Sequence, residues 1–263
     1  MLGFGDPLIG TGLSAGSAGG AAINCGAVTL AALRSAPPMT GFLADAPANG
    51  GLVLADIDFL ASLPRLPDSA CELQAIANRF AAPNTKVHLG AEATETRLKS
   101  LNDSGELAAY DVLVFATHGL TAGEAGAISP GLVLTPPTTA SARDDGLLSA
   151  AEIAGLDLNA ELVVLCACNT AAGDTGDEDG LSGLALAFFR AGAKSLLVTH
   201  WSVHSEAAVD VSTGLFSALE TDQTGQFSAA LRDATLDILA DTTRPAFHHH
   251  PSCWAAFSII GAT

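Results

Sequence analysis

The sequence is poor in charged side chains, and in basic ones above all. Only 15% of its 263 residues are charged, and 11 lysines and arginines stand against 28 aspartates and glutamates, which gives a formal net charge of −17. A nucleic-acid surface needs clustered lysine and arginine to contact phosphates, so we expect no nucleic-acid partner. The hydrophobic fraction of 49% indicates a globular chain rather than a disordered one.

Several motifs are also missing. There is no Cys-x-x-Cys pair, which removes the usual sign of a zinc ribbon, and no Gly-Lys pair of the kind that a nucleotide-binding P-loop contains. The five cysteines are odd in number and have no framework spacing, so we interpret them as reduced thiols in the cytoplasm. The N-terminus lacks the basic segment that opens a secretory signal, and we expect no membrane partner.

Two apolar runs end in reactive side chains. Val112-Leu-Val-Phe-Ala-Thr leads into His118, and Leu162-Val-Val-Leu-Cys-Ala leads into Cys168. Runs rich in valine and leucine are typical of strands buried on both faces of a parallel sheet. Because α/β proteins build their sites at the carboxyl ends of such strands, an imidazole and a thiol there suggest a base and a nucleophile.

Helical and strand patterns alternate along the rest of the chain. Further strands are expected at 1–7, 87–89, 195–201 and 254–260, with a hairpin at 131–135. Helices are expected at 70–80, 92–100, 181–191, 205–219 and 226–240, and a short segment at 150–155 is capped by Ser149. This alternation predicts an α/β fold, with one mainly parallel sheet flanked by helices on both faces.

We interpret residues 1–263 as a single domain. Residues 10–50 are rich in glycine, alanine, serine and proline without clear periodicity, which indicates an insertion or loop within it. The chain opens inside a strand pattern, which leaves open whether an N-terminal strand is missing.

His118 and Cys168 can form a catalytic dyad. Cysteine attacks a carbonyl as its thiolate, and a neighbouring histidine can supply that state by taking the proton. The two residues lie 50 positions apart, as in the caspase pattern in which a histidine precedes an Ala-Cys motif. Without further context, a buried histidine and a buried thiol in an inert core are the alternative.

Several sequence blocks extend this resemblance. In order, they are Leu2-Gly-Phe-Gly-Asp-Pro7, Phe115-Ala-Thr-His-Gly119, Leu165-Cys-Ala-Cys-Asn-Thr170, Gly180-Leu-Ser-Gly-Leu184, Ala191-Gly-Ala193 and Trp254-Ala-Ala-Phe257. Together they resemble the successive motifs of the CHAT-domain peptidases, relatives of caspases and separases. The resemblance covers most of the chain and spares mainly 10–50 and 121–146.

The resemblance implies a caspase-like α/β fold and a cysteine endopeptidase that needs no metal or other cofactor. On this basis His118 is the base, Cys168 is the nucleophile, and the backbone N–H groups of Gly119 and Cys168 form the oxyanion hole. It also implies a protein or peptide substrate and a regulatory sensor module, repeat module or partner protein. A catalytically inactive scaffold domain and a small-molecule hydrolase or acyltransferase stay open as alternatives.

Two more residues belong near this sheet edge. Cys166 lies two positions before Cys168 on the same strand, so we expect it to face the same side, deeper, and to serve packing. His200 ends the third apolar run and is a rival base. The resemblance is weaker there, because histidines stand at 200 and 204 where the family commonly has a leucine and an acidic residue.

An acidic loop follows Cys168 in the sequence. Recognition of a basic P1 residue, the residue before the cut bond, requires a carboxylate, and the loop offers four: Asp174, Asp177, Glu178 and Asp179. Relatives often prefer arginine or lysine, so we expect cleavage after a basic residue. The alternative is a solvated loop with no role in recognition.

Three consecutive histidines, His248, His249 and His250, precede Cys253. Consecutive side chains point in different directions, so few of them can share one ion, and we predict no metal site.

Overall fold

A six-stranded sheet forms the centre of the molecule, in the order β2-β1-β3-β7-β8-β9. The structure is a computed structural model that describes residues 1–9, 54–80, 84–122, 129–166, 183–201, 203, 205–221 and 225–262. The strands are β1 (Leu2–Pro7), β2 (Lys86–Gly90), β3 (Val112–Ala116), β7 (Leu162–Leu165), β8 (Ser195–Thr199) and β9 (Phe257–Gly261). All neighbours pair in parallel except β8 and β9, which are antiparallel.

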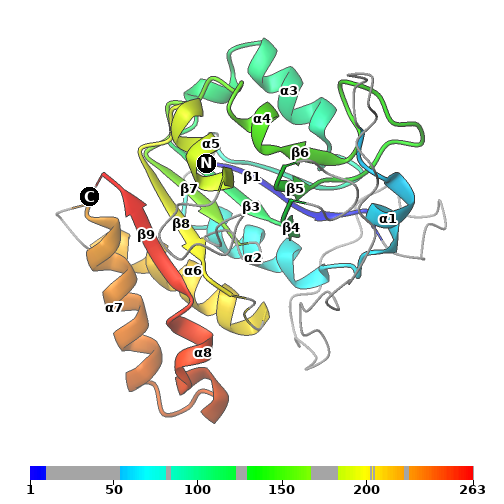
Figure 1. Ribbon diagram of the computed structural model, residues 1–263. Coiled ribbons are helices and arrows are strands. Elements are labelled where there is room, and N and C mark those ends of the chain that lie inside the picture. The colour runs from blue at the N-terminus through cyan, green and yellow to red at the C-terminus, as the bar shows by residue number, and fades with distance from the viewer. Residues whose placement is uncertain are drawn as a thin grey trace.

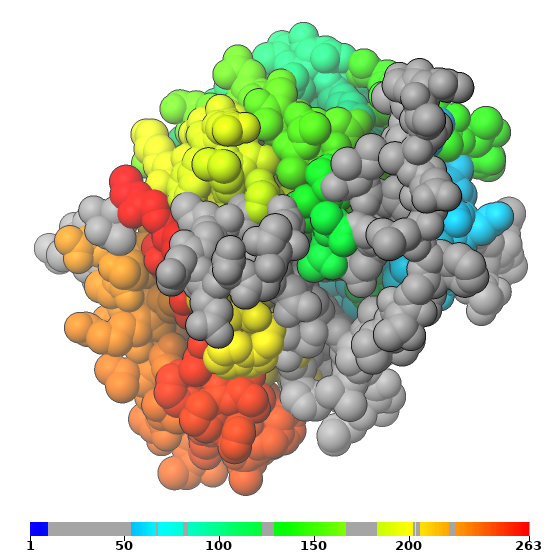
Figure 2. Space-filling model, in the orientation of Figure 1, coloured from blue at the N-terminus to red at the C-terminus, as the bar shows by residue number. Residues whose placement is uncertain are grey.

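Helices cover both faces of this sheet (Figure 1). One layer contains α3 (Glu95–Asp103), the 3-10 turn η1 (Leu107–Ala109), α4 (Ala150–Ile153) and α5 (Gly183–Ala191). The other contains α2 (Pro67–Ala77), α6 (Ser205–Thr221), α7 (Phe227–Ala240), η3 (Ala246–His249) and α8 (Pro251–Trp254). Helices α7 and α8 lie at the molecular surface (Figure 2). The prediction of a mainly parallel, doubly covered sheet in a single domain is confirmed.

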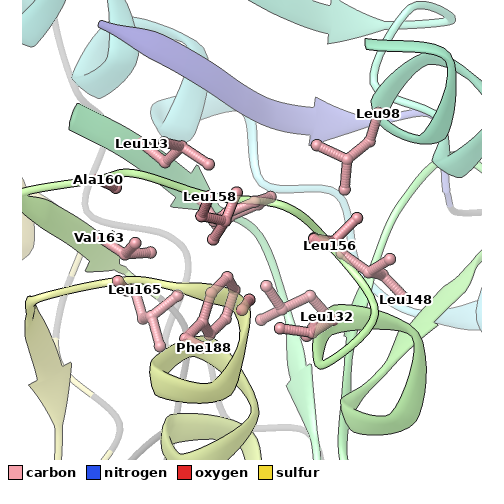
Figure 3. Close-up of a cluster of buried hydrophobic side chains, with 14 of the residues drawn as sticks. Leu98, Leu113, Leu132, Leu148, Leu156, Leu158, Ala160, Val163, Leu165 and Phe188 are labelled. Atoms are coloured by element: carbon pink, nitrogen blue, oxygen red, sulfur yellow. The ribbon is translucent and has the colours of Figure 1, made fainter. Parts of the chain in front are cut away.

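The apolar runs supply side chains to both layers. In β3, Leu113 and Phe115 pack in the cluster with α3, α4 and α5, whereas Val112, Val114 and Ala116 pack against α2 and α6. Figure 3 shows the first cluster, where Leu113, Val163 and Leu165 of the sheet meet Phe188 of α5. Each such buried side chain contributes about 1.5–3 kcal/mol to the free energy of folding, which explains the unbroken apolar runs.

A small antiparallel sheet adjoins the carboxyl end of β3. It consists of β4 (Gly119–Leu120), β5 (Gly131–Val133) and β6 (Leu147–Ser149), with β5 in the middle. The expected hairpin at 131–135 is therefore wrong: β5 is one strand, and its partners come from either side of it in the sequence. Helix α1 (Ile57–Ser62) lies beside this sheet and shares an apolar cluster with it.

Several helix boundaries differ from the sequence predictions for local reasons. Helix α2 begins at Pro67 rather than at residue 70, because proline fits the first helical turn, where its missing N–H is not needed. Helix α3 begins at Glu95 rather than at 92, because the Thr94 side chain caps it by accepting from the Arg97 N–H. The predicted Ser149 cap is confirmed, as a reciprocal capping box with Glu152.

Within the described ranges, no helix combines the length and apolar character that crossing a bilayer requires. The expected insertion at 10–50 lies outside the described residues.

Candidate functional site

His118 lies at the carboxyl edge of the central sheet. It follows the end of β3 by two residues, and β3 is flanked by β1 and β7. The residue is buried, with 6% of its surface exposed. A histidine is therefore placed where the carboxyl ends of three neighbouring parallel strands meet, as the sequence predicted.

A backbone carbonyl fixes the orientation of the His118 ring. Its Nε2 lies 2.8 Å from the carbonyl oxygen of Pro64, in the connection between α1 and α2. A carbonyl oxygen can only accept, so we assign the hydrogen of the neutral ring to Nε2. The other nitrogen, Nδ1, is then the one that can take a proton.

The small sheet holds the backbone around His118. The carbonyl oxygen of His118 accepts a hydrogen bond from the N–H of Val133, with 2.9 Å between nitrogen and oxygen. The neighbouring Thr117 hydroxyl donates to the carbonyl oxygen of Val133. Both contacts join the loop after β3 to Val133 of β5, so the small sheet holds residues 117–118 in place.

Gly119 is oriented by the same pairing. In the register of β4 and β5, Gly119 lies opposite Leu132, and the Val133–His118 bond defines this as a pair without mutual hydrogen bonds. In an antiparallel ladder, the N–H of such a residue points away from the partner strand. The Gly119 N–H is thus directed away from β5.

The strand that leads toward Cys168 runs beside β3. Strands β3 and β7 are parallel with Phe115 opposite Leu165, and the N–H of Cys166 donates to the carbonyl oxygen of Phe115 at 2.9 Å. Cys166 is 4% exposed and packs in the cluster with α2 and α6, which fits its predicted packing role. Cys168 and the acidic residues Asp174, Asp177, Glu178 and Asp179 lie outside the described residues.

The rival base His200 lies farther along the same edge. It follows β8, which is two strands away from β3 in the sheet order. Its Nε2 lies 2.9 Å from the Ser258 hydroxyl of β9, and its N–H donates to the carbonyl oxygen of Ala256. The structure thus links His200 to the antiparallel edge strand.

The three consecutive histidines diverge. Nδ1 of His248 lies 2.7 Å from Asp210 Oδ2, His249 Nε2 lies 3.1 Å from the Asp241 carbonyl oxygen, and His250 Nδ1 lies 2.8 Å from the Ser252 hydroxyl. Across the described ranges, no three side chains of histidine, cysteine, aspartate or glutamate gather as a metal site would require.

One cysteine departs from the interpretation of five reduced thiols. Cys71 in α2 is disulfide-bonded, whereas the other described cysteines, Cys166 and Cys253, are not part of a disulfide. An odd cysteine count does not prevent one pair from forming, because pairing depends on which sulfurs the fold brings together. The thiol count therefore does not determine the compartment.

The fold and this edge histidine define an α/β protein of the caspase-like type. The CHAT domain model matches residues 25–262, and the chain belongs to the CHAT-domain family. The family is associated with caspase-like cysteine peptidases.

A curated relative gives a second comparison. Over 116 residues, the chain is 36% identical to tetratricopeptide repeat protein 28 of Mus musculus. The matched segment is 44% of this chain and 4% of that protein, so the chain corresponds to a small part of the relative.

Proposed function

We propose that the chain is a cysteine endopeptidase in which His118 and Cys168 form the catalytic dyad. The observation that carries the proposal is the placement of His118: a buried imidazole, oriented by the Pro64 carbonyl, beside the parallel strand that leads toward Cys168. An inert core histidine does not require a position at this edge, where α/β folds place reactive groups.

Each group then has a defined chemical task. Nδ1 of His118 takes the proton of the Cys168 thiol, and the thiolate attacks the scissile carbonyl carbon. The N–H groups of Gly119 and Cys168 stabilise the oxyanion of the tetrahedral intermediate. The imidazolium returns its proton to the departing amine, and water activated by the same ring hydrolyses the thioester and restores the thiol.

The substrate part of the proposal is a protein or peptide cut after a basic P1 residue, recognised by Asp174, Asp177, Glu178 and Asp179. The net charge of −17 supports attraction of basic segments. A peptide library should show lysine or arginine at P1, and selection of aspartate or an apolar residue would contradict this part alone.

The name of the mouse relative refers to tetratricopeptide repeats, which supports a regulatory repeat module as the partner of this domain. The cytoplasmic location stays a prediction.

The dyad is tested by mapping cysteine alkylation. Iodoacetamide or a peptidyl chloromethylketone should label Cys168 selectively, and His118→Ala should slow this labelling and peptide hydrolysis by about 10²–10⁴-fold, the usual contribution of a general base. His200→Ala is the matched control and should leave both rates unchanged. Slow, uniform labelling of several thiols, unaffected by His118→Ala, would favour the inactive scaffold. Loss of labelling in His200→Ala instead would assign the base to His200.

A further inference from the structure

The orientation of His118 depends on a segment that is neither helix nor strand. Pro64 lies between α1 and α2, and its carbonyl oxygen is the acceptor for Nε2 of His118. A single backbone carbonyl in a connecting segment directs a side chain reliably only if the segment itself is fixed.

An ion pair fixes this segment to the end of β1. Nη2 of Arg65, the residue after Pro64, lies 2.9 Å from both carboxylate oxygens of Asp6. The Asp6 side chain is 15% exposed and that of Arg65 is 47% exposed. Strand β1 pairs with β3, the strand that precedes His118, and its carboxyl end lies beside the α1 region in Figure 1.

The backbone of Asp6 is strained. Its φ of 43° lies in the left-handed region, which residues other than glycine rarely adopt. The pairing of β1 with β2 also shifts register between Gly5 and Pro7, around this residue. Such strain persists only where surrounding contacts over-determine it, and it concentrates at functional sites.

Two further hydrogen bonds hold Asp6 to the same segment. The N–H of Asp6 donates to the Ser69 hydroxyl at 2.8 Å, and that hydroxyl donates to the carbonyl oxygen of Leu66 at 2.7 Å. Ser69 is completely buried. Burial raises the pKa of the Asp6 carboxyl, and Arg65 opposes that shift by favouring the charged form.

We propose that Asp6 and Arg65 are positioning residues for His118: they hold the Pro64 carbonyl against Nε2 and so set the tautomer and ring direction of the imidazole. This positioning of His118 acts in the protein without bound substrate. Its catalytic consequence rests on the proposed function, because it matters only if His118 Nδ1 receives a proton from Cys168.

The test compares Arg65→Gln with Arg79→Gln. Arg79, which follows α2, is an arginine of similar exposure, 40% against 47%, and its Nη1 lies 3.4 Å from Glu220 of α6, so its loss controls for removing a surface charge. Arg65→Lys and Asp6→Gly are second variants. Lysine keeps the charge without the fork of the guanidinium, and glycine relieves the strain at φ 43° while removing the carboxylate.

The direct measurement is the His118 tautomer by ¹⁵N–¹H NMR of the folded variants. Wild type and Arg79→Gln should show the Nε2–H form as the dominant neutral tautomer. Arg65→Gln and Asp6→Gly should show a mixture of tautomers, and Arg65→Lys should lie between. If Arg65→Gln and Asp6→Gly both keep the wild-type tautomer, the proposal is overturned.

The catalytic measurement is the pH profile of Cys168 alkylation. Arg65→Gln should lower the alkylation rate about tenfold and move its pH midpoint, whereas Arg79→Gln should match wild type. An unchanged midpoint and rate in Arg65→Gln would contradict the proposal, because a purely structural pair predicts that outcome. If wild-type labelling does not depend on His118, the proposed dyad fails, and the tautomer measurement still decides the positioning role.

Discussion

At the scale of single residues, the turn from α5 to β8 leaves no room for a side chain at Gly192. Its φ of +110° lies in the left-handed region, and an added Cβ would overlap the carbonyl oxygen of Leu158. The same turn is closed by the Leu158 N–H, which donates to the carbonyl oxygen of Ala191 at 2.8 Å. Glycine is therefore needed both for its backbone conformation and for the close approach of two backbone segments.

We expect Gly192→Ala to destabilise the protein by about 2–4 kcal/mol, since it adds a backbone strain of about 1–3 kcal/mol to a steric overlap. Gly155→Ala is the matched control, because an added Cβ there meets nothing closer than the Glu152 carbonyl oxygen at 3.4 Å. The control should change stability by less than about 1 kcal/mol. Urea denaturation of both variants measures the difference, and equal stabilities would show that the overlap is relieved by movement of the Leu158 segment.

At the scale of elements, a buried polar network joins α3 to the small sheet. Glu95, which is completely buried, accepts hydrogen bonds from the N–H groups of Asp145 and Gly146 at 2.8 and 2.7 Å. Lys99 lies 2.7 Å from Glu95 and 2.6 Å from Glu152, which caps α4. The network thus fixes the turn into β6, and through β5 it supports the loop that carries His118.

Burial raises the pKa of Glu95 to about 7, although Lys99 and the two backbone N–H groups favour its charged form. Burial alone would lower the pKa of Lys99, but the carboxylates of Glu152 and Glu95 outweigh it and raise that pKa. A carboxyl with a higher pKa in the folded state binds its proton more tightly there. Its stabilising contribution is therefore complete below about pH 4.5 and is lost as the pH rises through about 7.

We predict that the titration of Glu95 lowers the free energy of unfolding as the pH rises from about 4.5 to 8. The expected decrease is on the order of 1–3 kcal/mol. Glu95→Gln should flatten this decrease, because the amide oxygen can still accept from Asp145 and Gly146 but no longer titrates. Glu220→Gln, a change at an exposed carboxylate that is 48% accessible, should keep the wild-type slope. Chemical denaturation at a series of pH values gives the answer, and a wild-type slope in Glu95→Gln would assign the titration to another group.

At the scale of the whole molecule, the charge balance sets the response to salt. The net charge of −17 produces repulsion among carboxylates that salt screens, with a Debye length of about 10 Å at 0.1 M. Salt also weakens exposed ion pairs, such as Lys86–Glu106 and Lys194–Glu161, and this lowers the stability. The effect is small, because such pairs contribute about 0–1 kcal/mol each. Screening of the repulsion should therefore dominate.

We expect the midpoint of thermal unfolding to rise by several degrees between 10 mM and 300 mM NaCl at pH 7.5. An equal osmolality of glycerol serves as the control for effects that do not depend on ions, and should produce a smaller rise. A midpoint that falls with salt would mean that the ion pairs stabilise the fold more than the net charge destabilises it.

The sequence by itself determined the central sheet and the placement of a histidine at its edge. The apolar runs in β3, β7 and β8 are long because both faces of each strand are buried, and that requirement is visible in the amino-acid sequence. The blocks around His118 also determined the family, which the match over residues 25–262 confirmed.

Only the tertiary structure decided what surrounds His118. The strands of the small sheet are two or three residues long, and β5 pairs with segments that no local pattern connects to it. Pro64 meets His118 across 54 positions, Asp6 meets Arg65 across 59, and Glu95 meets Gly146 across 51. Local sequence reveals periodic burial within one element, whereas contacts between distant polar groups depend on how the elements pack, so the packing alone fixed the orientation of the imidazole.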